Sequence, residues 1–212
     1  MSSAAAPTTD VGDGGAFGPA MGIVAAVLGV MTLGAYVGRG LGAGASLVFL
    51  FLALLCFVGL RFARDAGGMS VGLLFVAGLF LGLGLAGTLD AYASADPGVV
   101  WQATAATALF VAALGSIGFA ISTDLSAGYR VLFVLLLALI VYGFVSLFTA
   151  MPGSNVIYAL LGLGIFGGYT VLDFNRLRGS GADDAVSIGA GIFLDIVNVF
   201  LFFLQIFDRR GD

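Results

Sequence analysis

Two aspartates stand out in this sequence because they lie among apolar residues. Asp173 and Asp195 fall in "VLDFNRLRGSGADDAVSIGAGIFLDIVNVF" (171–200), which is rich in leucine, isoleucine, valine and phenylalanine. An ionised aspartate at the centre of a membrane helix costs roughly 2.5–3.5 kcal/mol on insertion scales. Such residues usually face a helix-bundle interior or a water-filled path and have a partner. We therefore predict a functional role for Asp195; the structural alternative is a neutral aspartate that only ties helices together.

The chemistry that these two carboxylates suit is proton sharing. Asp173 ends one apolar segment and Asp195 lies near the middle of the next. If these two segments form antiparallel helices, the depths of the two aspartates in the membrane differ by no more than roughly 8–10 Å. Two carboxylates in one site cannot both ionise cheaply, so one retains a proton. We predict a pair that alternates between a proton-sharing, tied state and a repelling, open state. For Asp173 alone, the alternative is an interfacial residue beside the arginines that follow it.

The composition indicates what kind of protein holds this pair. The chain has 212 residues, of which 60% are hydrophobic and only 9% charged, and its mean hydropathy is +1.14. Soluble domains carry roughly 25% charged residues, so the sequence predicts an all-α, polytopic membrane protein. Histidine is absent and Cys56 is the single cysteine, which excludes an intrachain disulfide and nearly excludes a zinc site. The acidic pI of 4.4 argues against nucleic acid as a partner, and no cofactor is expected.

Seven apolar segments, separated by short breaks, are each long enough to cross a bilayer. They cover 19–37, 43–61, 70–90, 99–122, 131–150, 155–174 and 185–207. Residues 1–18 lack the basic stretch of a secretory signal peptide, so we predict a disordered tail followed by one membrane domain, 19–212. The bilayer is the first partner that this organisation implies.

Arginines in the loops predict the orientation, because cytoplasmic loops carry an excess of basic residues. If every segment spans, the loops on the N-terminal side hold Arg61, Arg64, Arg130, Arg176 and Arg178. The opposite side then holds Arg39, Arg209 and Arg210, so the N-terminus is expected in the cytoplasm. A re-entrant last segment would move the C-terminal arginines to the first group, but its length favours spanning.

Three further polar residues are candidates for contact with the aspartate pair. Arg61 ends the second segment and Arg64 follows it; either could extend to the headgroups or reach a carboxylate and favour its ionised form. Asn198 lies nearly one turn past Asp195, so we predict a hydrogen bond between them.

The stretch around the aspartates resembles a known family. "LDFNRLR", followed after a short loop by "LDIVNVFLFFLQIF", is similar to the C-terminal signature of the Bax inhibitor-1 family (transmembrane Bax inhibitor motif proteins). "ATALFVAALGSIGFAISTDLS" resembles the family's fourth helix and the loop after it, and "CFVGLRFARDAGG" the end of its second helix. The resemblance covers nearly everything after the tail, and it implies seven helices with the C-terminal helix at the centre.

For bacterial members the resemblance implies a pH-sensitive calcium leak controlled by a carboxylate pair. Asp173 and Asp195 match that pair and would contact calcium transiently; Arg61 is the best match for the basic residue that engages it, with Arg64 as a competitor. Two positions differ from many members: Leu172 stands where they have tyrosine, and Gln102 where bacterial members carry an acid. The Gln102 difference predicts altered conduction or selectivity.

The leading prediction is a passive cation leak in the plasma membrane of a prokaryote, with calcium as the permeant ion and protons as the control. The main alternative is a non-conducting regulatory protein that binds other membrane proteins, such as stress factors or proteases. An enzyme is not expected: the chain lacks the Gly-x-Gly-Asp and Pro-Ala-Leu motifs of intramembrane aspartyl proteases, and it has no histidine for a rhomboid protease. Without lysine it cannot be a retinal protein, and no inverted repeat indicates a proton-coupled transporter.

Overall fold

A computed structural model describes residues 15–63, 68–146 and 154–208, and in them the predicted all-α fold of seven membrane-length helices is confirmed. The helices are α1 (Phe17–Val37), α2 (Ala43–Phe62), α3 (Gly68–Ala95), α4 (Pro97–Ala120), α5 (Gly128–Ser146), α6 (Ser154–Gly179) and α7 (Ala185–Phe207). A single 3₁₀ turn, η1 (Ala182–Asp184), leads into α7. Most of the predicted tail lies outside the described residues, and α1 already includes Phe17.

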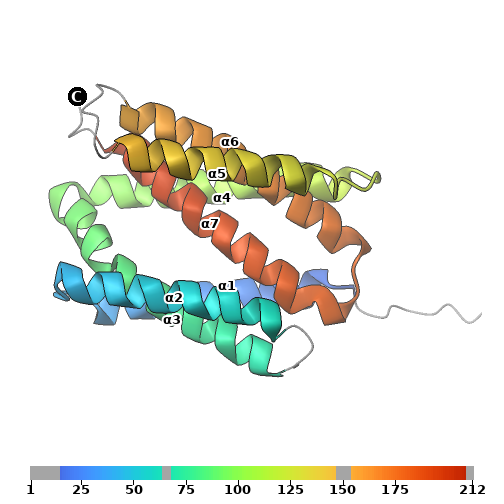
Figure 1. Cartoon of the computed structure of the whole chain (residues 1–212), viewed down its shortest axis with the longest axis horizontal. Coiled ribbons are helices and arrows are strands. Elements are labelled where there is room, and N and C mark those ends of the chain that lie inside the picture. Colours follow the sequence, from blue (N-terminus) through green and yellow to red (C-terminus); the bar gives the residue numbers. More distant parts are fainter. Residues whose placement is uncertain (1–14, 64–67, 147–153, 209–212) are drawn as a thin grey trace, which may run out of the picture.

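Helix α7 occupies the centre of the bundle, as the family resemblance implies. In Figure 1 it crosses obliquely between one group formed by α1, α2 and α3 and another formed by α4, α5 and α6. It contacts α6, α4 and α1 most extensively. A residue on α7 can therefore face either group, which makes this helix the natural place for a group that controls how the two halves hold together.

The last helix runs the length of the bundle without a break. It begins at the end where α1 begins and finishes at the opposite end (Figure 1). Its 23 residues correspond to about 35 Å of helix, enough to cross a hydrocarbon core about 30 Å thick. A re-entrant segment would reverse its direction within the membrane, and α7 does not.

Helices α3 and α6 extend furthest past the C-terminal ends of the apolar segments that predicted them. Helix α3 continues to Ala95 and ends where Asp96 and Pro97 follow. The Asp96 carboxylate then accepts a hydrogen bond of 2.8 Å from the Gly98 N–H and thereby caps α4. Helix α6 continues through its polar end to Gly179. Asp173 consequently lies inside a helix rather than in a loop after one.

Glycine allows the first group of helices to pack closely. A Cβ atom on Gly82 of α3 would collide with the backbone carbonyl oxygen of Met31 on α1, so only glycine permits this approach. The adjoining core contains Val27 from α1, Leu74 from α3 and Phe193 from α7. Close backbone contact thus joins α1 to α3, and apolar side chains pack α7 against this half of the bundle.

Candidate functional site

The two aspartates singled out in the sequence lie together in the interior of the bundle. Asp173 on α6 is 8% exposed and Asp195 on α7 is 4% exposed. They are near enough for their charges to interact. The structure thus brings together the two carboxyl groups of the predicted pair across the α6–α7 contact.

Asp173 is held from two directions. Its Oδ1 accepts a hydrogen bond of 2.5 Å from the Tyr129 hydroxyl at the start of α5. Its Oδ2 lies against Gly191 of α7, where an added Cβ would collide with it. Gly191 precedes Asp195 by four residues, one helical turn, and side chains on a helix lean toward its N-terminus. Both carboxyl groups therefore converge over the Gly191 turn.

Asp195 has a sparser set of partners. The hydroxyl of Thr170, a fully buried residue of α6, lies within hydrogen-bonding reach of its carboxyl group. Its Oδ2 is buried and receives no hydrogen bond from any N–H or hydroxyl donor of the described residues. A buried polar oxygen without a partner is costly. A proton held between Asp195 and Asp173 would satisfy this oxygen.

An amide near Asp173 fastens the connection between α4 and α5. The side chain of Asn175 donates to the carbonyl oxygens of Ile121 (2.8 Å) and Thr123 (3.1 Å), and its Oδ1 accepts from the Leu125 N–H at 3.1 Å. This connection leads directly into α5, whose first turn contains Tyr129. Asn175 therefore fixes, through the backbone, the position from which the tyrosine reaches Asp173.

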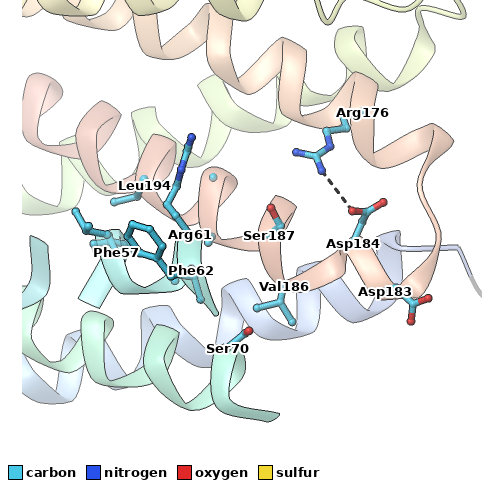
Figure 2. A pocket seen from close by; sticks show the side chains of 14 residues that line it. Phe57, Arg61, Phe62, Ser70, Arg176, Asp183, Asp184, Val186, Ser187 and Leu194 are labelled. Carbon is cyan, nitrogen blue, oxygen red and sulfur yellow. Dashed lines mark hydrogen bonds and ion pairs between the residues drawn. The ribbon is translucent and has the colours of Figure 1, made fainter. Parts of the chain in front are cut away.

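A charged cleft of about 980 Å³ opens beside the pair, at the end of the bundle where α7 begins. Figure 2 shows Arg61 on one side of it and an ion pair between Arg176 and Asp184, 3.3 Å long, on the other. Gly191 forms part of its lining. Because Asp173 Oδ2 lies against Gly191, the inner wall of the cleft is adjacent to the carboxyl pair.

Neither Arg61 nor Asn198, both predicted to contact the aspartate pair, forms an ion pair or hydrogen bond with it among the described residues. Arg61 is exposed on the cleft and forms no ion pair with Asp173 or Asp195; Arg64 lies outside the described residues. The predicted bond from Asn198 to Asp195 is absent, because the Asn198 amide donates to the Leu194 carbonyl of its own helix at 2.8 Å. Asparagine within a helix commonly bonds back to the carbonyl four residues earlier.

The described residues contain no group of three or more acidic, histidine or cysteine side chains that could hold a metal ion. Calcium takes six to eight oxygen ligands in a resident site. Asp173 and Asp195 thus have the chemistry for brief contact with a passing cation; transient calcium contact remains a prediction.

Four residues of the site were not predicted from the sequence: Tyr129, Thr170, Asn175 and Gly191. Helical spacing was an available signal for two of them, because Thr170 precedes Asp173 by three residues and Gly191 precedes Asp195 by four. No such signal existed for Tyr129, which comes from another helix and is distant in sequence. Of the two other positions singled out in the sequence, Leu172 packs against Gly128, and Gln102 is exposed on α4.

Comparison with known proteins supports the resemblance. The sequence profile of the family described as "Inhibitor of apoptosis-promoting Bax1" matches residues 19–212. An uncharacterized protein of Deinococcus radiodurans is 33% identical, over 74% of this chain and 71% of its own length. An uncharacterized protein of Helicobacter pylori strain J99 is 27% identical, over 78% of this chain and 72% of its own. The chain belongs to the Bax inhibitor-1 family of membrane proteins.

Proposed function

We propose that this protein is a passive cation leak, with calcium as the permeant ion, whose opening is controlled by protonation of Asp173 and Asp195. The observation that carries the proposal is the burial of two neighbouring carboxyl groups within a bundle of membrane-length helices, next to a charged cleft. A pair that only held helices together would not need to border such a cleft.

The proposed mechanism follows from the electrostatics of the pair. When one proton is shared, the two carboxyl groups attract and hold α6 against α7, which closes the path. When that proton leaves, two negative charges face each other in a medium of low dielectric constant and repel. The repulsion favours separation of α6 from α7, and the exposed carboxylates then attract a cation from the cleft. Opening therefore increases as the pH rises.

The arginines support an orientation for this path. Among the described residues, Arg61, Arg130, Arg176 and Arg178 lie in the last turns of α2 and α6 or the first turn of α5, at the end where α1 begins, while Arg39 follows α1 at the other end. By the positive-inside rule we propose a cytoplasmic N-terminus in the bacterial plasma membrane. The cleft then opens toward the cytoplasm. We assign the pair no hydrolytic role.

Calcium influx into liposomes tests this function. Purified protein is reconstituted with an entrapped calcium dye, and influx is measured across pH for the unmodified chain, Asp173→Asn and Asp195→Asn. We expect influx to rise with pH in the unmodified chain and to become independent of pH in both variants, since an amide at either position removes the repulsion between two negative charges. Asp90→Asn is the matched control, because Asp90 is an exposed acid of α3.

Two outcomes would contradict the proposal. If influx through the unmodified protein equals that of empty liposomes at every pH, the protein does not conduct, and the non-conducting regulatory alternative is favoured. If Asp195→Asn conducts like the unmodified chain at every pH, the protein conducts but the pair does not control it.

A further inference from the structure

We infer that Tyr129 is a third member of the switch: a positioning residue whose hydroxyl competes with Asp195 for Asp173 and thereby sets the pH at which the pair comes apart. This inference rests on the proposed function. It depends on a contact between α5 and α6 that no sequence motif indicates.

The geometry places Asp173 between two partners, each of which meets a different carboxyl oxygen. On the α5 side, the Tyr129 hydroxyl donates to Oδ1 at 2.5 Å. On the α7 side, Oδ2 lies over the Gly191 turn, toward which the Asp195 carboxyl group leans. A hydroxyl donor stabilises a carboxylate more than a neutral acid, because charge-assisted hydrogen bonds are the stronger kind. Tyr129 thus favours the ionised form of Asp173, whereas a proton shared with Asp195 favours the tied form.

The position of Tyr129 is rigidly determined, which a positioning role requires. The connection before α5 is bonded through its backbone to Asn175, two residues after Asp173 on the same helix. Its ring lies 6.1 Å, centroid to centroid, from that of Tyr169 on α6. The hydroxyl therefore approaches Asp173 from a fixed direction rather than by a chance rotamer.

Tyr129 also borders a second hollow, of about 520 Å³, which Asn175 and Arg176 line as well. This hollow is separate from the Arg61 cleft, although Arg176 lines both. A water molecule in this hollow would give the tyrosine hydroxyl a second partner when Asp173 takes up a proton. The hydroxyl can thus engage or release Asp173 without being left unsatisfied.

Titratable and charged groups face Asp173 from α5, α6 and α7. From α7 it faces Asp195, from its own helix Tyr169 and Arg176, and from α5 Tyr129. Arg176 is engaged with Asp184 at 3.3 Å. Of these groups, Tyr129 is the one whose hydroxyl donates to Asp173.

The test compares Tyr129→Phe with Tyr169→Phe. Each variant removes one hydroxyl from one of two neighbouring rings, but no hydrogen bond to the pair is lost with the Tyr169 hydroxyl. Without Tyr129, ionised Asp173 loses its donor and the tied state gains. We expect the midpoint of calcium influx to move upward by about one pH unit for Tyr129→Phe, with an unchanged plateau at high pH, and to stay in place for Tyr169→Phe.

A second readout separates this inference from the proposed function. The infrared absorption of protonated carboxyl groups is titrated in proteoliposomes, and the signal of the pair is identified as the part missing from Asp173→Asn and Asp195→Asn. If the unmodified chain does not conduct but Tyr129→Phe still moves this titration upward, the leak is contradicted and the role of Tyr129 stands. If the titration is the same in Tyr129→Phe, Tyr169→Phe and the unmodified chain, or moves downward in Tyr129→Phe, the inference is overturned. Thermal unfolding of both variants in detergent establishes that each is folded.

Discussion

Toward α1, α2 and α3, helix α7 presents apolar side chains such as Phe193 and Val197, which pack with Val27 and Leu74. Toward α6 it presents Asp195, which lies beside Asp173. The first contact depends on shape alone and does not change with pH. The second depends on a few polar groups whose interaction reverses from attraction to repulsion when one proton leaves. Under the proposed mechanism, the fold combines around one helix a permanent contact, toward α1, α2 and α3, with a switchable one, toward α6.

The difference predicts that the two contacts fail in different ways. A change on the α1–α3 side should affect whether the protein folds, with the pH midpoint of the folded protein unchanged. A change on the α5–α6 side should affect the midpoint or the extent of opening, with a smaller loss of stability. The following substitutions test this distinction.

The largest effect is expected from Gly82→Ala on the permanent side. The added methyl group would collide with the Met31 carbonyl oxygen, which belongs to the backbone and cannot turn aside. Overpacking of this kind costs about 1–3 kcal/mol, so we expect a clear fall in the thermal unfolding temperature and in the yield of folded protein. Gly72→Ala on the same helix is the control, since no atom lies within 4 Å of its added Cβ. Equal stability of the two variants would contradict the close contact.

Gly191→Ala makes the corresponding change on the switchable side. Here the methyl group would meet the Asp173 carboxyl group, which can move, so the loss of stability should be smaller than for Gly82→Ala. The displaced carboxyl group can no longer converge with Asp195, and the tied state is weakened. We expect influx at low pH to rise toward its value at high pH.

The control for Gly191→Ala is Gly164→Ala on α6, where the added Cβ has no atom within 4 Å. It should keep the full pH dependence. If Gly191→Ala keeps it as well, the convergence of the carboxyl groups over this turn has no part in gating.

Asn175→Ala tests whether the α4–α5 connection contributes to the switch. The substitution removes the bonds to Ile121, Thr123 and Leu125, so Tyr129 is held less firmly and the pH midpoint should move upward, by less than in Tyr129→Phe. Calcium influx across pH measures the shift. Asn198→Ala is the matched control, because among the described residues that amide donates within its own helix, to the Leu194 carbonyl. An unchanged midpoint in Asn175→Ala would separate the connection from the switch.

The sequence predicted the elements of this fold well because membrane helices are specified locally. A long apolar run satisfies its own backbone and must cross the bilayer, so seven such runs predict seven helices. The high free-energy cost of placing Asp195 in a membrane helix can likewise be recognised without knowledge of the neighbouring helices. The apolar run around Asp195 is read directly from the sequence, and the pairing with Asp173 follows because the two helices are joined by a short loop and pack antiparallel.

What the sequence did not predict depends on contacts between distant helices. Tyr129 reaches Asp173 across 44 positions of the chain, and its hydroxyl is indistinguishable in the sequence from that of any tyrosine near a membrane interface. The bond predicted from Asn198 to Asp195 is absent for the opposite reason. Its spacing from Asp195 was correct for contact, but the amide donates to the Leu194 carbonyl of its own helix instead. Local spacing predicts which residues share a face, and competition among acceptors decides which bonds form.

The smallest effect is expected from Thr170→Val, which removes one hydroxyl beside Asp195. In the structure this hydroxyl donates to the Phe166 carbonyl at 2.9 Å, so its oxygen is available to accept a hydrogen bond from a neutral Asp195. When Asp195 ionises, the hydroxyl can turn and donate to the carboxylate instead. The charged bond is the stronger of the two, so its loss disfavours ionisation, and the influx midpoint should move upward by about half a pH unit.

Thr107→Val is the matched control for this change. Thr107 is also buried, and its hydroxyl also donates to the carbonyl four residues earlier in its own helix, at 2.7 Å. The two substitutions therefore remove the same local bond, and they differ in that Thr170 lies beside Asp195. A shift in Thr170→Val that is absent from Thr107→Val would come from the carboxyl group, and equal midpoints would confine the role of Thr170 to its own helix. Because both variants lose the same bond within their own helix, the difference between their midpoints measures whether a residue other than the two aspartates contributes to the pH dependence.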